Sequence, residues 1–209
     1  NLLHKKYEED AELRDGFSLN SEFLGKEYSY DQTHYCIFCH NQGKDSCSKG
    51  LKEKASNEFK KNELQVTLTG CPLEEKISEM NYLKSEGLLF APLAMAMIDN
   101  PMLALTGHRI CNDCMKSCIY QKQEPVDIPH IESQVLMDVL NLSYGLEIYN
   151  LLTYWNPLNI ERPIVKNLTQ KNVMVVGSGP AGINAAYHLL MEGNFVTMID
   201  GLRIMPLPN

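Results

Sequence analysis

The stretch Asn172-Val-Met-Val-Val-Gly-Ser-Gly-Pro-Ala-Gly182 decides how this part of the 209-residue sequence folds. It opens with the mostly apolar run of a buried parallel β-strand, and its three glycines satisfy the pattern G-x-G-x-x-G. Residues 181–190 then follow as a helical pattern, and Phe195-Val-Thr-Met-Ile-Asp200 reads as a second strand. Strand, glycine turn, helix and strand in this order predict the start of a dinucleotide-binding unit.

The glycine loop predicts a nucleotide site because each small residue has a steric reason to be there. Gly177 permits a tight turn, Gly179 lets the backbone approach a pyrophosphate, and Gly182 lets the helix pack closely against the strand. Free N–H groups at the helix start face the phosphates, and Asp200 would accept hydrogen bonds from the ribose. The loop alone fits FAD or NAD(P), and a turn without a ligand is the alternative. The predicted cofactor-binding residues are Gly177, Ser178, Gly179, Pro180, Ala181, Gly182 and Asp200.

Upstream of this unit the chain has the pattern of a helical protein. Apolar residues at helical spacing predict helices that begin at Cys71-Pro72 and that cover 88–98 and 131–152. The fold class is therefore mainly α, followed by an incomplete α/β Rossmann unit that stops before a third strand. We expect a piece of a longer protein, inactive alone. The predicted division is an N-terminal extension at 1–33 with a short helix near 7–13, a helical domain at 34–153, a connector at 154–170, and the dinucleotide-binding unit at 171–209.

Composition restricts the partners and the compartment. The chain is 44% hydrophobic and 22% charged, as in soluble globular proteins, and its net charge of −7 disfavours nucleic acid. No apolar run reaches the roughly 18 residues of a membrane span, and the first residues lack a signal-peptide core. We therefore expect a cytoplasmic protein without nucleic-acid or membrane partners, in which cysteines are thiols or metal ligands and not disulfides.

The cysteines are the strongest chemical signal in the helical region. Short-spaced thiolates in polar loops suit zinc or an iron–sulfur cluster. Two four-iron clusters need eight ligands, so seven thiolates leave one position to fill, whereas one zinc site would leave three thiols idle. Buried thiols without a metal would not explain two C-x-x-C pairs. The count favours iron–sulfur over zinc. The seven cysteines fall in three places: Cys36, Cys39 and Cys47; Cys71; and Cys111, Cys114 and Cys118.

Several independent motifs occur in an order that resembles one family. That family is the small (beta) subunit of bacterial NADPH-dependent glutamate synthase, to which the N-terminal part of dihydropyrimidine dehydrogenase is similar. The resemblance covers about residues 34–208. The motifs that carry it are Cys71-Pro72, Asn100-Pro101, Thr106-Gly-His-Arg-Ile-Cys111, Pro125-Val-Asp-Ile-Pro-His-Ile-Glu132 and Val175-Val-Gly-Ser-Gly-Pro-Ala-Gly182.

The resemblance implies an α-helical ferredoxin-like domain with two 4Fe-4S clusters, followed by an FAD-binding Rossmann domain. The family completes its ligands with an oxygen-bearing side chain, whose place Glu132 takes, although a plain early-helix glutamate is the alternative. This chain departs from the family in a polar insertion before Cys71, which we expect to loop outward, and in a short gap between Cys111 and Cys114. The implied ligand sets are Cys36, Cys39, Cys47 and Cys118 for one cluster, and Cys71, Cys111, Cys114 and Glu132 for the other.

The function implied by the resemblance is that of an NAD(P)H-dependent oxidoreductase module. A hydride from NADPH or NADH would reach FAD, and single electrons would pass through the clusters to a partner subunit or domain. No catalytic acid or base is expected in this stretch. Two alternatives stay open: a zinc-stabilised interaction module fused to a nucleotide-binding Rossmann domain, and a docking subunit that has lost its clusters.

Overall fold

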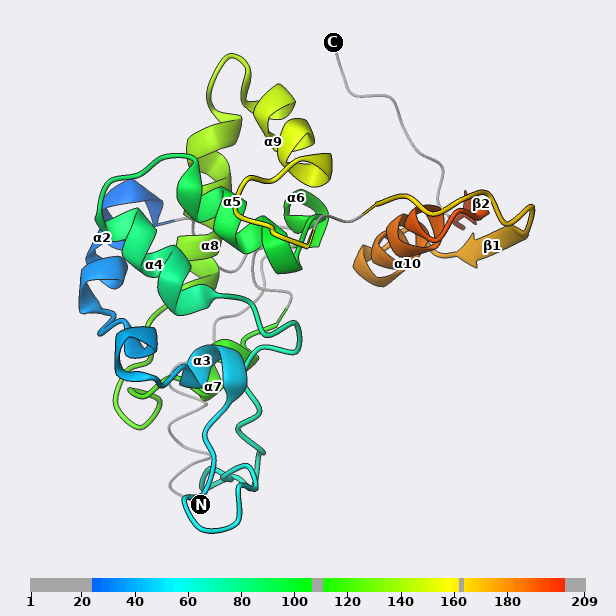
Figure 1. Ribbon diagram of the computed structural model, residues 1–209. Coiled ribbons are helices and arrows are strands. Elements are labelled where there is room, and N and C mark those ends of the chain that lie inside the picture. Colours follow the sequence, from blue (N-terminus) through cyan, green and yellow to red (C-terminus); the bar gives the residue numbers. More distant parts are fainter. Residues whose placement is uncertain (1–23, 107–110, 162–163, 202–209) are drawn as a thin grey trace.

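The computed structural model describes residues 24–106, 111–161 and 164–201, and within them the chain is mostly helical with one small parallel sheet (Figure 1). The helix expected near residues 7–13 lies outside the described residues. The elements are α2 (Gly25–Tyr35), the 3₁₀ helix η1 (Cys39–Gln42), α3 (Ser46–Lys49), α4 (Ile77–Ser85), α5 (Ala91–Asp99), α6 (Leu103–Thr106), α7 (Asp113–Lys116), α8 (Ile128–Leu140), α9 (Gly145–Tyr154), β1 (Asn172–Val176), α10 (Pro180–Met191) and β2 (Phe195–Ile199).

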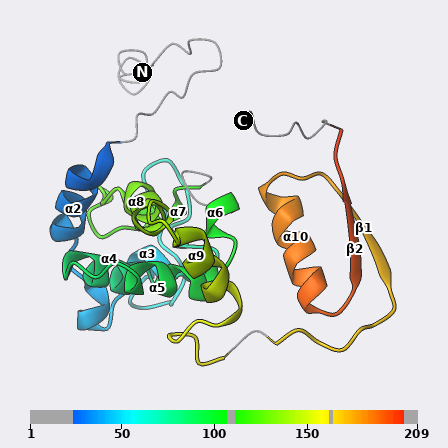
Figure 2. The same ribbon diagram turned by 90° about the horizontal axis from the view of Figure 1, so that it is seen from above.

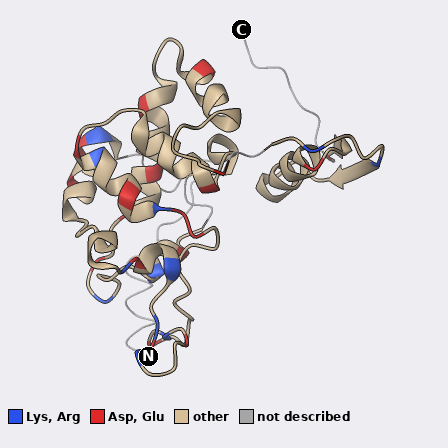
Figure 3. Ribbon diagram, viewed as in Figure 1, with Lys and Arg blue, Asp and Glu red and all other residues tan. Residues whose placement is uncertain are grey.

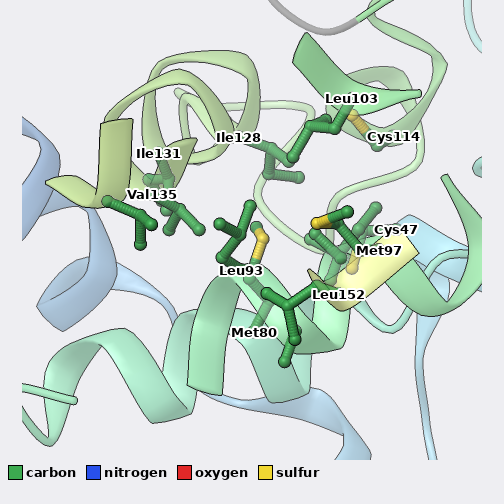
Figure 4. Packing of buried hydrophobic residues seen from close by; sticks show 14 of the residues in the cluster. Cys47, Met80, Leu93, Met97, Leu103, Cys114, Ile128, Ile131, Val135 and Leu152 are labelled. Carbon is green, nitrogen blue, oxygen red and sulfur yellow. The ribbon is translucent and has the colours of Figure 1, made fainter. Parts of the chain in front are cut away.

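Helix α8 forms the centre of the helical body. Its buried residues Ile131, Val135 and Val139 recur every four residues and line one face of the helix. Leu93 of α5 and Met80 of α4 pack against this face (Figure 4). Burial of each such side chain stabilises the fold by roughly 1.5–3 kcal/mol. Two cysteine-bearing helices, α3 and α7, join the edge of the same core, so the core fixes where their thiols lie.

Two helix predictions are corrected by the structure. The single helix expected over 131–152 is two helices, because the chain turns back between Asn141 and Tyr144 and α9 begins at Gly145. The helix expected to open at Cys71-Pro72 begins only at Ile77. Glu74 has a φ of +52°, in the left-handed region that a right-handed helix cannot pass through, so Pro72 belongs to a turn that precedes α4.

The turn between α8 and α9 has room for glycine alone. A β-carbon at position 145 would lie 2.0 Å from the carbonyl oxygen of Val139. We expect Gly145→Ala to destabilise the helical body by about 1–3 kcal/mol, which corresponds to a fall in Tm of roughly 5 °C in thermal unfolding. Gly201→Ala is the matched control, since a β-carbon there meets no atom within 4 Å. Equal Tm values for the two variants would contradict this account of the turn.

The C-terminal elements form a strand–helix–strand unit. β1 pairs with β2 in parallel, from Asn172 opposite Phe195 to Val176 opposite Ile199. α10 connects the two strands, packs on one face of the pair, and lies between the strands and the helical body (Figure 2). A cavity of about 390 Å³ separates α10 from α5 and α9. The order of elements is the one that the glycine-loop sequence predicts.

The domain limits expected from the sequence stay a prediction. The last helix before the sheet, α9, ends at Tyr154, and the first strand begins at Asn172. In the part of the chain that the structure describes, we find no helix with both the length and the apolar character needed to cross a membrane.

Candidate functional site

Four cysteines from distant parts of the sequence line one cavity. The first follows the last residue of α2, and the second begins η1. The third lies within α3, and the fourth is the second residue after the end of α7. All four are free thiols, and two of them are buried. The cavity holds about 20 Å³, the room of roughly one water molecule, so a four-iron cluster would require the thiol side chains to spread apart. The four cysteines of this first site are Cys36, Cys39, Cys47 and Cys118.

A loop residue with left-handed backbone and a buried amide side chain belong to the first site. Phe38, between Cys36 and Cys39, has a φ of +50°, and the buried Asn81 lines the same cavity as Cys36. Burial raises the pKa of Cys36 and Cys39, and burial and the Asp45 carboxylate raise the pKa of Cys47. Metal ligands must be thiolates, so loading this site would release protons from buried thiols.

A second cavity, of about 130 Å³, is lined by the remaining three cysteines and by two glutamates. Cys111 is exposed, whereas Cys114 lies buried in α7. Burial and the nearby Glu75 carboxylate raise the pKa of Cys71 to about 11. Burial and the carboxylate of Glu132, in the first turns of α8, raise the pKa of Cys114. The residues of this second site are Cys71, Cys111, Cys114, Glu132 and Glu75.

The two glutamates of the second site line the same cavity. Burial, followed by the charge of Glu132, raises the pKa of Glu75 to about 8. The second site therefore combines three thiols with two carboxyl groups, of which Glu75 is harder to ionise than an exposed glutamate.

The structure thus divides the last three cysteines between the two sites. Cys118 lines the first cavity, although Cys111 and Cys114, its neighbours in sequence, line the second. This is the grouping that the family resemblance implies. Among the described residues, no group of three or more His, Cys, Asp or Glu side chains is arranged to hold a metal ion. The structure shows which residues share a cavity, and their ligation of a cluster stays a prediction.

The insertion between Cys47 and Cys71 extends outward from the helical body (Figure 1). Its base is closed by a hydrogen bond of 2.8 Å from the backbone N–H of Cys71 to the carbonyl oxygen of Cys47. At Gly70 a β-carbon would lie 2.4 Å from the carbonyl oxygen of Ser48, so the two chains meet closely there. Lysines and glutamates are interspersed along the insertion (Figure 3). The closed base makes Cys47 and Cys71 neighbours in space in spite of the inserted residues.

The predicted nucleotide-binding residues gather where β1 ends and α10 begins. Gly177 has a φ of +108°, and a β-carbon on Gly182 would lie 1.9 Å from the carbonyl oxygen of Gly177. A β-carbon on Gly179 would meet no atom within 4 Å, which leaves open space beside that backbone. Both the backbone N–H and the hydroxyl of Ser178 donate to one Asp200 oxygen at 2.6 Å. Pro180 and Ala181 begin α10.

Sequence reasoning missed two side chains that the structure places at the cysteine sites. Asn81 is buried beside Cys36, and Glu75 lies in the second cavity. Neither residue stands in a sequence motif that could have identified it. Residues 107–110 of the motif Thr106-Gly-His-Arg-Ile-Cys111 lie outside the described residues.

Comparison with known proteins gives distant and partial relatives. No family model matches the chain. It is 62% identical over 106 residues to the Uncharacterized protein RP006 of Rickettsia prowazekii, a match that covers 51% of this chain and 15% of that protein. It is 32% identical over 149 residues to the Glutamate synthase [NADPH] small chain of Bacillus subtilis, covering 68% of this chain and 27% of that protein. The small chain of Mycobacterium tuberculosis is 28% identical over 132 residues, covering 63% and 24%.

The chain spans less than a third of the length of these curated relatives. The relatives from Bacillus subtilis and Mycobacterium tuberculosis are both named small chains of an NADPH glutamate synthase. The chain is therefore a distant relative, over about two thirds of its length, of proteins named glutamate synthase small chain.

Proposed function

We propose that this chain is the electron-transfer part of an NAD(P)H-dependent flavin and iron–sulfur oxidoreductase similar to the glutamate synthase small subunit. The observation that carries the proposal is the gathering of seven cysteines, from three places in the sequence, around two separate cavities. Four thiols line one cavity, and three thiols with a glutamate line the other, which supplies eight donors for two four-iron clusters. The distant glutamate synthase relatives support the same function.

The chemistry of the donor sets fits such clusters. Thiolates are the usual ligands of iron–sulfur clusters, and thiols from both cavities pack against the apolar core. Asn81, which lines the first cavity, would donate from its amide group to a cysteine sulfur, which lowers the electron density on a ligand and raises the reduction potential. When bound, FAD would accept hydride pairs and the clusters would carry single electrons to a partner subunit or domain.

The strand–helix–strand unit would bind the dinucleotide part of FAD. Gly179 leaves open space for a pyrophosphate at the start of α10, and the N–H groups of that helix start suit its charge. Asp200 is oriented by Ser178, and its carboxylate would accept hydrogen bonds from the ribose. We assign this unit as the beginning of a Rossmann domain of a cytoplasmic enzyme.

A zinc-stabilised interaction module is the second candidate, and one observation favours it. The first cavity has four thiols around the room of roughly one water molecule, which suits a single tetrahedral ion. Such a module would use the glycine loop to bind a nucleotide without passing electrons.

Metal analysis of the full-length protein, purified without oxygen, separates these functions. We expect about eight irons and eight acid-labile sulfides per chain, with a visible absorbance that dithionite bleaches. Zinc without sulfide would establish the interaction module instead. A protein with neither metal nor sulfide would be a docking subunit without clusters, and would refute the proposed function.

A further inference from the structure

The loop that carries Cys39 has an unusual backbone conformation. Phe38, the residue before Cys39, has a φ of +50°, in the left-handed region that few residues other than glycine adopt. Such a conformation costs free energy and persists only where the surrounding structure holds it. The contacts of this loop therefore indicate what fixes the position of Cys39 as a ligand, provided that the first site holds a cluster as proposed above.

A buried hydroxyl holds the residue that follows Cys39. The Ser78 oxygen lies 2.7 Å from the Nδ1 atom of the His40 ring, and it also accepts a longer bond of 3.4 Å from the His40 backbone N–H. Ser78 is 1% exposed and lines the cavity of the first site. Among the residues that the structure describes, the His40 ring has no second hydrogen-bond partner. The direction of this ring therefore depends on Ser78.

The same helix supports the residue on the other side of Cys39. Tyr82 follows Ser78 by about one turn of α4, and the Phe38 ring meets the Tyr82 ring edge to face at a centroid distance of 5.5 Å. The His40 ring contacts the same Tyr82 at 6.2 Å. Both sequence neighbours of Cys39 therefore pack against one face of α4.

Helix α4 is itself held by the core of the helical body. Its residues Ile77 and Met80 are buried in the core, so the helix cannot turn Ser78 away from the loop without exposing apolar surface to water. Ser78 thus transmits the rigidity of the core to the loop that carries Cys39.

We propose that Ser78 is a positioning residue of the first site, which holds the loop through His40 and thereby directs the Cys39 sulfur towards the other three thiols. A ligand that is held in this way is prepared for the cluster before it binds. Removal of an outer partner of a metal ligand weakens metal binding by roughly tenfold to a hundredfold. The second cluster, whose cavity contains neither Ser78 nor His40, should not respond.

The test follows iron loss to the chelator ferrozine in the full-length holoprotein, together with the midpoint potential of each cluster by EPR-monitored titration. We expect Ser78→Ala to speed iron release from the first cluster by roughly tenfold to a hundredfold and to shift its potential, with the second cluster unchanged. Ser29→Ala is the matched control. Ser29 is also buried and donates to the His130 carbonyl oxygen at 3.3 Å, but it lines neither cavity, so both clusters should release iron at the wild-type rate.

His40→Phe decides whether Ser78 acts through His40. This variant keeps an aromatic ring against Tyr82 but lacks the Nδ1 atom, and position 40 is only partly buried, which limits the effect on folding. We expect it to speed release from the first cluster as Ser78→Ala does. Adding Ser78→Ala to it should then change the rate by no more than about threefold, because the shorter of the two bonds is already gone.

A fully additive increase in the double variant would mean that the Ser78 hydroxyl acts on the cluster directly, and would overturn the inference. Wild-type release from Ser78→Ala, or equal losses from both clusters, would overturn it as well. A wild-type protein without iron and sulfide would instead refute the proposed function, and the inference with it.

Discussion

Cys118→Ala is expected to halve the iron and sulfide content of the holoprotein, from about eight of each per chain to about four. Cys118 lines the first cavity, so its removal takes away one ligand of the first cluster and leaves the ligand set of the second intact. The measurement is iron and sulfide analysis combined with EPR of the reduced protein, in which one of the two cluster signals should disappear.

Cys114→Ala is the matched variant, because Cys114 is buried to a similar extent and lies only four residues away. Since it lines the second cavity, we expect it to remove the other EPR signal and to leave the one that Cys118→Ala abolishes. If both variants lost the same signal, Cys118 and Cys114 would share one metal, and the two-cavity assignment would be wrong. Both variants should keep their helical circular dichroism.

The order of the cysteines explains why their grouping could be anticipated. A cluster needs ligands at several corners, and one short loop rarely supplies them all, so the last cysteine of a loop is often used by the other cluster. The family resemblance implied this arrangement for Cys118. In the structure, Cys118 lines the same cavity as Cys36, Cys39 and Cys47. The insertion did not disturb the grouping, because its base is closed by a backbone hydrogen bond beside two cysteines.

Local backbone geometry was harder to predict. Apolar spacing continues across residues 141–144, so the pattern indicated one helix and gave no sign of the turn before Gly145. Only glycine fits at position 145, because a β-carbon there would lie too close to the carbonyl oxygen of Val139. The spacing of apolar residues in the sequence does not reveal this close approach. In the same way, no pattern indicates that Glu74 takes a positive φ and delays the start of α4.

The other side chains that lie beside the cysteines could not be predicted from the sequence either. Asn81 and Cys36 are far apart in the chain and meet only because α2 packs against α4. Glu75 looked like one of several charged residues after Pro72, and only the packed structure places it in the second cavity. Residues with chemistry of their own, such as cysteine, can be recognised from sequence, whereas residues that orient them require the packed structure.

Gly179→Val in the full-length protein is expected to abolish flavin retention and to leave the rest of the protein folded. The structure separates these effects, because a β-carbon at position 179 meets no protein atom within 4 Å. The added side chain would instead fill the space that a pyrophosphate needs, and should weaken flavin binding by more than about tenfold, or about 1.4 kcal/mol. Flavin absorbance after gel filtration measures the loss, while Tm and iron content should equal those of the wild type.

Gly182→Ala provides the contrast that makes this result interpretable. A β-carbon there would lie 1.9 Å from the carbonyl oxygen of Gly177, so the substitution must deform the loop itself. We expect it to lower flavin retention together with the stability of the strand–helix–strand unit, whereas Gly179→Val lowers flavin retention alone. A Gly179→Val protein that keeps its flavin would remove this loop from the cofactor site. One that loses both flavin and stability would mean that position 179 is needed for packing and not for a ligand.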